Sequence, residues 1–552
     1  MNGNLKLRYM KKVLLLLILI VFSSCKNDSE ERERELAGAD SLAGKEIEYK
    51  VLDSRFINKK TLWAPFEEEL ETFSEDRYAM IRPLIMDKTI PELQRSVKNG
   101  DFTYEELVKF YLYRIEKFDR NNSLSLNSVI SLNPNILEEA REKDKAFQAG
   151  ERKHLIFGIP VLLKDNVNTE NMSTTAGSVV LQNHQTQDAF IVQQLKMNGA
   201  LILGKTNLSE WAYFFCGDCP SGYSAIGGQT LNPYGRKTLD TGGSSSGSAV
   251  AVAANFAPAA VGSETSGSIL SPSSQNSLVG LKPTVGILSR GGIIPISSTL
   301  DTPGPITKTV VDNAILFSAM TGRDIDDFAS RDNQNSESDF YTNLGGTTLK
   351  GKRFGAIKPL MEDSLYVAAL NDLRNLGAEI VEFDPEEVNL PNFTRLLNLD
   401  MKKDLPEYFE KYGGDAGIRS VDDVIAYNIQ DSLNRSPYGQ KLFEGISRDS
   451  ADEKEFAAIK DTLRRNGRRF FEVPMKKHNL HGILSINNYH AGFAAVAQYP
   501  AITVPMGYDE NTNAPKGLTF FARPFKEADL YGWAHNYEQG TQKRISPESY
   551  NK

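Results

Sequence analysis

The segment TGGSSSGSAVAVAANFAPAAVGSETSGSIL, residues 241–270, is the part of the sequence from which the fold is most readily inferred. Two turns of small residues, from Thr241 to Ser248 and from Glu264 to Ser268, flank an Ala/Val-rich run that predicts a buried helix ending near Ala254. A buried site needs such small residues because the backbone must approach it closely. The same residues also fit a flexible linker, and on local features alone both interpretations remain open.

Apolar runs before this segment predict strands that alternate with helices. Residues 158–163 and 200–205 are short and strand-like, and residues 188–198 between them predict a helix. Further helices are predicted to begin after Thr89, after Thr103 in a capping box, and at Ile136. Alternating strands and helices favour an α/β fold with a mostly parallel sheet covered on both faces.

The composition of the chain argues against several classes of protein. The chain has 552 residues, of which 40% are hydrophobic and 24% charged, so a large buried core is expected and disorder is not. The net charge is −8, which argues against a nucleic-acid partner. Three cysteines and six histidines form no zinc-ligand pattern, and G-x-x-x-x-G-K-[S/T] is absent, so neither a metal nor a phosphate loop is expected.

The N-terminus has the pattern of a targeting segment. A basic start precedes an apolar run of ten residues, Val13 to Phe22, which is too short to span a bilayer. Ser23, Ser24 and Cys25 follow and resemble the lipobox of bacterial lipoproteins, although an uncleaved anchor helix or an accidental cysteine would fit as well. The resemblance implies a signal peptide at 1–24, lipid on Cys25, a polar tether at 25–54, and a body at 55–552 held to the bacterial cell envelope by its lipid alone.

Cys216 and Cys219 form a close pair in the sequence C-G-D-C. A local disulfide is the favoured interpretation, because an oxidising envelope compartment permits it. A redox-active pair and two reduced, partly buried thiols are the alternatives.

Three separated matches resemble the amidase signature family, serine hydrolases that cleave carboxamides with a Ser-Ser-Lys triad. They are Lys164 at the end of an apolar strand, Gly-Gly-Ser-Ser at 242–245, and Gly-Ser-Ile at 267–269. The separation of 24 positions between Ser244 and Ser268 also matches that of the family. Further matching text occurs at 204–211, 227–230, 280–286, 301–305 and 499–507, so the resemblance covers about residues 89–544. It implies a single large α/β domain with a central mixed, twisted sheet covered by helices on both faces.

The resemblance also implies roles for individual residues. Ser268 would be the nucleophile, Ser244 the bridging serine and Lys164 the base, which must be neutral to accept a proton. The peptide bond Gly243-Ser244 would be cis. Backbone N–H groups of the turn that enters the helix, those of Thr265, Ser266 and Gly267 with Ser268 as a further candidate, would form the oxyanion hole, and no cofactor is required.

At some positions the sequence differs from the residue that is commonest in the family. Ser266 replaces a frequent Gly, Glu264 replaces Asp, and Leu270 replaces Arg. The last two also occur in the branch of bacterial peptide amidases, whereas Ser266 has no explanation. Substrate contacts are not identified; Tyr489 and His490 are candidates for the pocket rim.

The expected function is an envelope-anchored amidase that hydrolyses a small or peptide-like carboxamide to a carboxylate and ammonia or an amine. One alternative is the related amidotransferase A subunit, which supplies ammonia. The other is a catalytically silent binding lipoprotein with the same fold. The sequence does not indicate the oligomeric state.

Overall fold

The computed structural model describes residues 46–120, 123–152, 154–330, 339–342, 344–414 and 416–551. The expected signal peptide, Cys25 and most of the expected tether lie outside these residues. Within them, no helix is both long enough and apolar enough to cross a membrane.

The compact unit begins at Glu48, seven residues before the expected boundary at residue 55. The carbonyl of Leu52 accepts a hydrogen bond from Gln229 N at 2.8 Å, and Asp53 forms an antiparallel bridge with Gly228. The expected tether at 25–54 is therefore too long, because its last residues pair with the backbone of the folded body.

The described residues form one eleven-stranded sheet and one small two-stranded sheet. In the large sheet the strand order is β1-β3-β2-β6-β8-β7-β12-β13-β11-β9-β10. Its strands are β1 (Val129–Leu132), β2 (Pro160–Lys164), β3 (Leu201–Thr206), β6 (Ala259–Glu264), β7 (Val279–Lys282), β8 (Thr302–Thr307), β9 (Arg353–Ile357), β10 (Glu379–Phe383), β11 (Gly482–Ile486), β12 (Ala501–Tyr508) and β13 (Pro515–Phe521); the small sheet pairs β4 (Tyr223–Ser224) with β5 (Gly228–Gln229).

The large sheet is mixed. Strands β3, β2 and β6 run parallel near one edge, and β11, β9 and β10 run parallel at the other. The strands between them pair antiparallel. The mixed sheet implied by the family resemblance is confirmed, whereas the mostly parallel sheet inferred from local alternation is wrong for the centre.

Helices cover both faces of this sheet. Successive side chains of a strand point to opposite faces, and those of β13 divide accordingly. Phe521 contacts Phe471 of α18, with ring centroids 5.2 Å apart, whereas Phe520 contacts Tyr537 of α20, at 6.2 Å. The expectation of helices on both faces is therefore confirmed.

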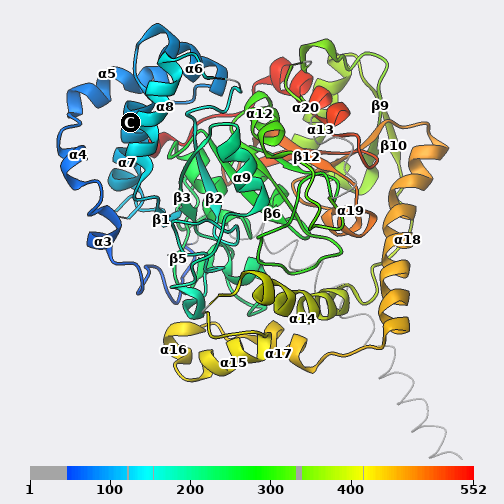
Figure 1. The fold of residues 1–552 in the computed structure, drawn as a ribbon. Helices are drawn as coiled ribbons and strands as arrows, with labels where there is room; N and C mark the ends of the chain where they lie inside the picture. The colour runs from blue at the N-terminus through cyan, green and yellow to red at the C-terminus, as the bar shows by residue number, and fades with distance from the viewer. Residues whose placement is uncertain are drawn as a thin grey trace, which may run out of the picture. The chain divides into compact units, whose positions relative to one another are not determined.

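The helices agree well with the expected positions. Thr89 and Thr103 both form complete capping boxes at the starts of α6 and α7. In Figure 1 the N-terminal helices gather beside β1 and β3, while α14 to α17 lie together elsewhere on the body. The helices are α3 (Lys59–Trp63), α4 (Glu67–Glu71), α5 (Glu75–Ile85), α6 (Ile90–Asn99), α7 (Tyr104–Phe118), α8 (Ile136–Gln148), α9 (Phe190–Met197), α10 (Ser246–Ala253), α11 (Leu270–Gln275), α12 (Val310–Met320), α13 (Ser364–Asn375), α14 (Phe393–Tyr412), α15 (Val421–Ile429), α16 (Ser432–Arg435), α17 (Lys441–Arg448), α18 (Glu453–Lys477), α19 (Ala491–Ala497) and α20 (Glu527–Thr541).

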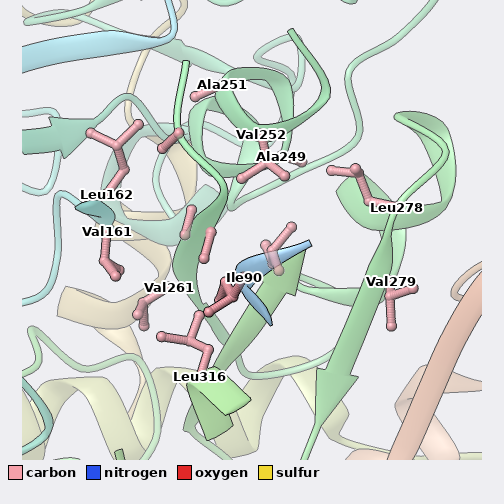
Figure 2. Close-up of a cluster of buried hydrophobic side chains, with 14 of the residues drawn as sticks. Ile90, Val161, Leu162, Ala249, Ala251, Val252, Val261, Leu278, Val279 and Leu316 are labelled. Atoms are coloured by element: carbon pink, nitrogen blue, oxygen red, sulfur yellow. The ribbon is translucent and has the colours of Figure 1, made fainter. Parts of the chain in front are cut away.

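The Ala/Val-rich run of the opening segment forms α10, and every residue of that helix is buried. Figure 2 shows Ala249, Ala251 and Val252 of α10 among the buried side chains of β2 and β6, such as Leu162 and Val261. A linker is thereby excluded, because the segment lies at the centre of the core. Small side chains let this helix approach the sheet closely.

Arg114 of α7 ties distant parts of the chain together from a fully buried position. Its guanidinium donates to the carbonyls of Asn255 and Ala254, both at 2.9 Å, and to the carbonyl of Tyr550 at 2.5 Å. Tyr550 lies near the C-terminus, which Figure 1 places beside α7. The buried cation thus satisfies carbonyls from two other segments.

We expect Arg114→Leu to lower the free energy of unfolding by roughly 3 kcal/mol or more, because it leaves buried carbonyls without a donor. Chemical denaturation measures the change. Arg95→Leu, at an exposed position of α6, is the matched control and should change stability by less than about 0.5 kcal/mol. Equal effects of the two substitutions would contradict a structural role for Arg114.

Candidate active site

Two neighbouring parallel strands bring the predicted site residues together. β2 ends at Lys164 and β6 ends at Glu264, and the strands pair in parallel from Val161 with Ala259 onward. Their carboxyl ends therefore lie at the same edge of the sheet. Ser244 precedes α10 and Ser268 precedes α11, so both serines stand in turns at helix starts near that edge.

The amine of Lys164 is completely buried and makes three hydrogen bonds. Its Nζ lies 2.7 Å from Ser244 Oγ, 2.9 Å from Ser263 Oγ and 3.0 Å from the carbonyl oxygen of Ser263. Asn166 Nδ2 also donates to Ser263 Oγ, at 3.0 Å. Sequence analysis did not identify Ser263 or Asn166, although both lie one or two residues from predicted elements of the site.

Burial lowers the pKa of Lys164 to about 7, against the opposing influence of Asp301 and Glu264. A neutral amine has two N–H groups and one lone pair. The carbonyl of Ser263 can only accept, so it takes one N–H. In the neutral form the lone pair is then available to accept the hydroxyl proton of Ser244, which is the direction of transfer that a base requires.

The peptide bond between Gly243 and Ser244 is cis. The carbonyl of Ser244 accepts a hydrogen bond from Ser209 N at 3.1 Å, and Ser209 Oγ accepts from Gly222 N at 2.9 Å. The bridging serine is thus held on its backbone side by the segment that follows β3. Its hydroxyl faces Lys164.

The carboxylate of Glu264 organises the turn around Ser268. It accepts hydrogen bonds from the N–H groups of Gly267 at 2.7 Å, Ile269 at 2.8 Å and Leu270 at 3.0 Å. Gly267 N–H, which the family resemblance placed in the oxyanion hole, therefore already has an acceptor. The structure does not support that assignment, because the Glu264 carboxylate already accepts a hydrogen bond from this N–H group.

Other N–H groups of the same turn remain available. Among the described residues, none accepts a hydrogen bond from the N–H groups of Thr265, Ser266 or Ser268. The hydroxyl of Ser268 likewise has no hydrogen bond to another described residue, and its side chain is half-buried. The serine and three backbone donors thus lie together without internal partners.

Thr265 is held by a neighbouring acid. Its Oγ1 donates to Asp301 Oδ1 at 2.5 Å, and Asp301 Oδ2 accepts from the N–H groups of Ile296 and Ser297, both at 2.8 Å. Burial raises the pKa of Asp301. Asp301 therefore supports the turn that carries the N–H donors. Sequence analysis included it in the matching stretch at 301–305 but gave it no role.

Asn488 approaches the same turn from the C-terminal half of the chain. Gly267 has φ +86°, and a Cβ built there would lie only 3.0 Å from Asn488 Nδ2. Glycine is therefore required at this position. The amide of Asn488 has no hydrogen-bond partner among the described residues, so it is a polar group available beside the nucleophile turn that sequence analysis missed.

His490 packs against an aromatic side chain of α18. Its ring stacks on Phe470, with centroids 5.2 Å apart, and its Nδ1 lies 2.9 Å from Ser485 Oγ. Burial lowers the pKa of His490 to about 4, so it is neutral at physiological pH. Tyr489 is about one-third exposed, at 36%.

Cys216 and Cys219 are joined by a disulfide in the structure. The hydroxyl of Tyr213 donates to the carbonyl of Cys219 at 2.9 Å. Trp211, Ala212 and Tyr213 all have positive φ, so the segment from Trp211 to Cys219 folds back on itself near the site. Cys25 lies outside the described residues.

A strand-end lysine, a buried bridging serine and a partly exposed serine beside free N–H groups define a serine hydrolase without histidine. The model of the Amidase family matches residues 106–531. This chain belongs to the amidase family, and it is accordingly a hydrolase of carbon–nitrogen bonds.

Individual relatives support this assignment. A probable amidase of Arabidopsis thaliana is 34% identical over 84% of this chain and 92% of its own length. The crystal structure of an amidase family protein from Bacillus anthracis superposes with a TM-score of 0.85 at 37% identity, over 91% of this chain and 99% of that one. The peptide amidase of Stenotrophomonas maltophilia superposes with a TM-score of 0.79 at 37% identity, over 84% and 98%. Glutamyl-tRNA(Gln) amidotransferase A subunits, such as that of Acinetobacter baumannii, match at a lower identity of 31%, over 82% of this chain and 96% of their own.

We expect Glu264→Gln to reduce kcat by about 10- to 100-fold, because an amide offers one acceptor oxygen where the turn needs two. Steady-state kinetics measures this, and Glu362→Gln at an exposed position is the control. Unchanged kcat in Glu264→Gln would show that the carboxylate does not hold the turn.

Proposed function

We propose that the protein hydrolyses a carboxamide through an acyl-enzyme on Ser268. The observation that carries the proposal is the buried contact of 2.7 Å between Lys164 Nζ and Ser244 Oγ, at the strand edge where Ser268 and three free N–H groups also lie. A serine hydroxyl is a weak nucleophile unless a base accepts its proton. Lys164, with its lowered pKa, is that base, and Ser244 connects it to Ser268.

The hydrolysis proceeds in two stages, acylation of Ser268 and release of the acyl group by water. Ser268 Oγ attacks the amide carbon, and its proton passes to Ser244, whose own proton passes to Lys164. As the C–N bond breaks, Ser244 donates a proton to the leaving nitrogen and recovers one from Lys164, so ammonia or an amine departs. Water then attacks the ester carbon by the same route and releases the carboxylate and Ser268.

The oxyanion of each tetrahedral intermediate is assigned to the N–H groups of Thr265 and Ser266, with Ser268 N–H as the third donor. Fixed N–H donors stabilise developing negative charge because they need no reorganisation during the reaction. Gly267 is not among them, since Glu264 takes its N–H at 2.7 Å. The Ser266 side chain leaves this backbone donor intact, so the departure from family text is compatible with catalysis.

The substrate class that we propose is a peptide-like carboxamide. The support is the similarity to the Stenotrophomonas maltophilia peptide amidase and the amide of Asn488, which can pair with a peptide group near Ser268. We also propose that lipid on Cys25 anchors the protein to the bacterial cell envelope, with 1–24 as its signal peptide. The support for the anchor is the sequence pattern alone.

The two alternative functions explain fewer of the observations. An amidotransferase A subunit acts with a tRNA-bound substrate, whereas this chain is acidic and carries an export-like N-terminus. A silent binding protein has no need of a buried lysine, which costs stability.

We expect Ser268→Ala to abolish amide hydrolysis and covalent labelling by a fluorophosphonate probe. Loss of the nucleophile should lower kcat by about 1,000-fold or more. Ser271→Ala, three residues further in α11, should retain both properties. Labelling that persists in Ser268→Ala, detected by mass spectrometry, would refute the assignment.

We expect kcat/KM to rise with pH through an apparent pKa of about 7, because Lys164 must lose its proton before it accepts one from Ser244. Stability has the same sign: between about pH 7 and the ordinary lysine pKa of 10.5 the unfolded chain binds more protons, so stability rises across that window. The pH profile of kcat/KM of the wild type measures the first effect. Denaturation of the wild type and of Lys164→Met at several pH values measures the second. A rate independent of pH from 5 to 9 would contradict this role.

A further inference from the structure

The second half of α18 carries a dense cluster of positive charge. Residues 464–477 read RRNGRRFFEVPMKK, with six cations and one acid, although the whole chain has a net charge of −8. All six cationic side chains are exposed. In Figure 1 α18 lies along one border of the body, and α5 lies at the opposite border. The proposed hydrolysis uses none of these cations.

The helix holds the cations on a fixed backbone. Its buried residues recur every three or four positions, as at Leu463, Gly467 and Phe471, so one face packs on the body and the other is exposed. A Cβ built on Gly467 would lie only 2.5 Å from Val496 Cγ2, which shows how closely α18 approaches α19. The exposed side chains therefore project from a helix that cannot shift easily against the body.

An open cavity of about 950 Å³ lies along the exposed face of this helix. Four cationic side chains and one carboxylate of α18 line it: Arg465, Arg468, Arg469, Lys476 and Glu472. Tyr499 and Pro524, from outside the helix, complete much of the remaining wall. The charge of the cavity is therefore positive.

Only part of this charge is neutralised within the chain. Glu472 lies 3.2 Å from Lys476 Nζ, and Arg469 donates to Glu386 at 2.9 Å. Arg465 donates to the hydroxyl of Thr462 at 3.3 Å. No carboxylate of a described residue forms an ion pair with Arg465 or Arg468. These two guanidinium groups keep a charge that an external anion can neutralise.

Exposed apolar side chains accompany the cations. Val473 lines the cavity and is 36% exposed, and Phe525, which follows Pro524 of the cavity wall, is 60% exposed. Cations beside exposed apolar groups suit the surface of a lipid bilayer, where the cations meet headgroup phosphates and the apolar groups enter the interface. A small soluble anion would leave the apolar groups in water.

We propose that the exposed face of α18 from Arg464 to Lys477, together with Phe525, docks on a bilayer surface that contains anionic phospholipids. A layer of phosphodiester headgroups supplies negative charge along the length of the helix, and guanidinium groups pair with phosphate oxygens in a bidentate way. The inference concerns the folded body, so it requires neither lipid on Cys25 nor the proposed hydrolysis. If the anchor is present, this surface decides which face of the body turns toward the membrane.

Binding to vesicles of different charge is the first test. The full chain is titrated with vesicles of phosphatidylcholine alone and with vesicles of equimolar phosphatidylcholine and phosphatidylglycerol. Each basic residue at an anionic surface strengthens binding by roughly fivefold. We therefore expect Arg465→Gln combined with Arg468→Gln to weaken binding to the anionic vesicles about tenfold or more, and to leave binding to the neutral vesicles unchanged. The N-terminal segment is the same in both proteins, so their ratio reports on α18.

Arg95→Gln combined with Lys98→Gln is the matched control. It also removes two exposed cations three positions apart on one helix, in this case α6. The control protein should bind the anionic vesicles as wild type does, and circular dichroism checks the fold of both variants. Equal affinity of wild type and the α18 variant for the anionic vesicles, or equal losses in the two variants, would overturn the proposal.

The orientation of the bound protein is the second test. The three tryptophans of the chain, Trp63, Trp211 and Trp533, are buried, so an added tryptophan on the surface reports its own surroundings. Phe525→Trp places a reporter beside the cations, and Met80→Trp places one on α5, where Met80 is 64% exposed. We expect brominated lipid in the anionic vesicles to quench the reporter at position 525 but not the one at position 80. Equal quenching of both, or of neither, would contradict docking through α18.

Nucleic acid offers the same phosphodiester charge without an apolar layer. A DNA duplex added in excess to the vesicle-bound protein separates the two partners. We expect the protein to stay on the anionic vesicles, because Val473 and Phe525 gain contacts only there. Displacement by DNA, together with weaker DNA binding of the Arg465→Gln, Arg468→Gln variant, would assign this surface to nucleic acid and overturn the membrane proposal.

Discussion

The burial of one lysine amine is the constraint on which the site depends. Lys164 is completely buried, and its Nζ forms hydrogen bonds with Ser244 and Ser263, at 2.7 to 3.0 Å. A charged amine there costs free energy, so burial lowers its pKa into the range where it can act as a base. Parallel pairing of β2 with β6 sets this geometry, because it brings Lys164 and Ser263 to the same edge of the sheet.

A second buried charge positions the nucleophile. The Glu264 carboxylate takes three N–H groups of the turn around Ser268, and those of Thr265, Ser266 and Ser268 have no acceptor in the part of the chain that the structure describes. The same strand thus carries a contact of the base and the support of the nucleophile. Because Glu264 takes the N–H group of Gly267, the oxyanion is left to the other donors of the turn.

Local structure was predictable where short-range physics decides it. Thr89 and Thr103 form capping boxes because their partners lie three residues away, and the helix at 246–253 is buried as its alanines and valines indicate. The alternation of strands and helices along the sequence did not predict whether neighbouring strands pair parallel or antiparallel. The central strands are antiparallel, and long-range contacts set their order. The start of the body was misplaced for the same reason: Leu52 and Asp53 read as a polar tether but pair with Gln229 and Gly228.

The sequence by itself predicted Lys164, Ser244 and Ser268 as the triad, because their types and spacing suit the chemistry and resemble a known family. Only the tertiary structure decided which N–H groups are free, since that depends on where the Glu264 carboxylate lies. It also brought Asn488 against Gly267. Asn488 is more than one hundred positions from the nucleophile, and packing alone, rather than any local pattern, places it at the site.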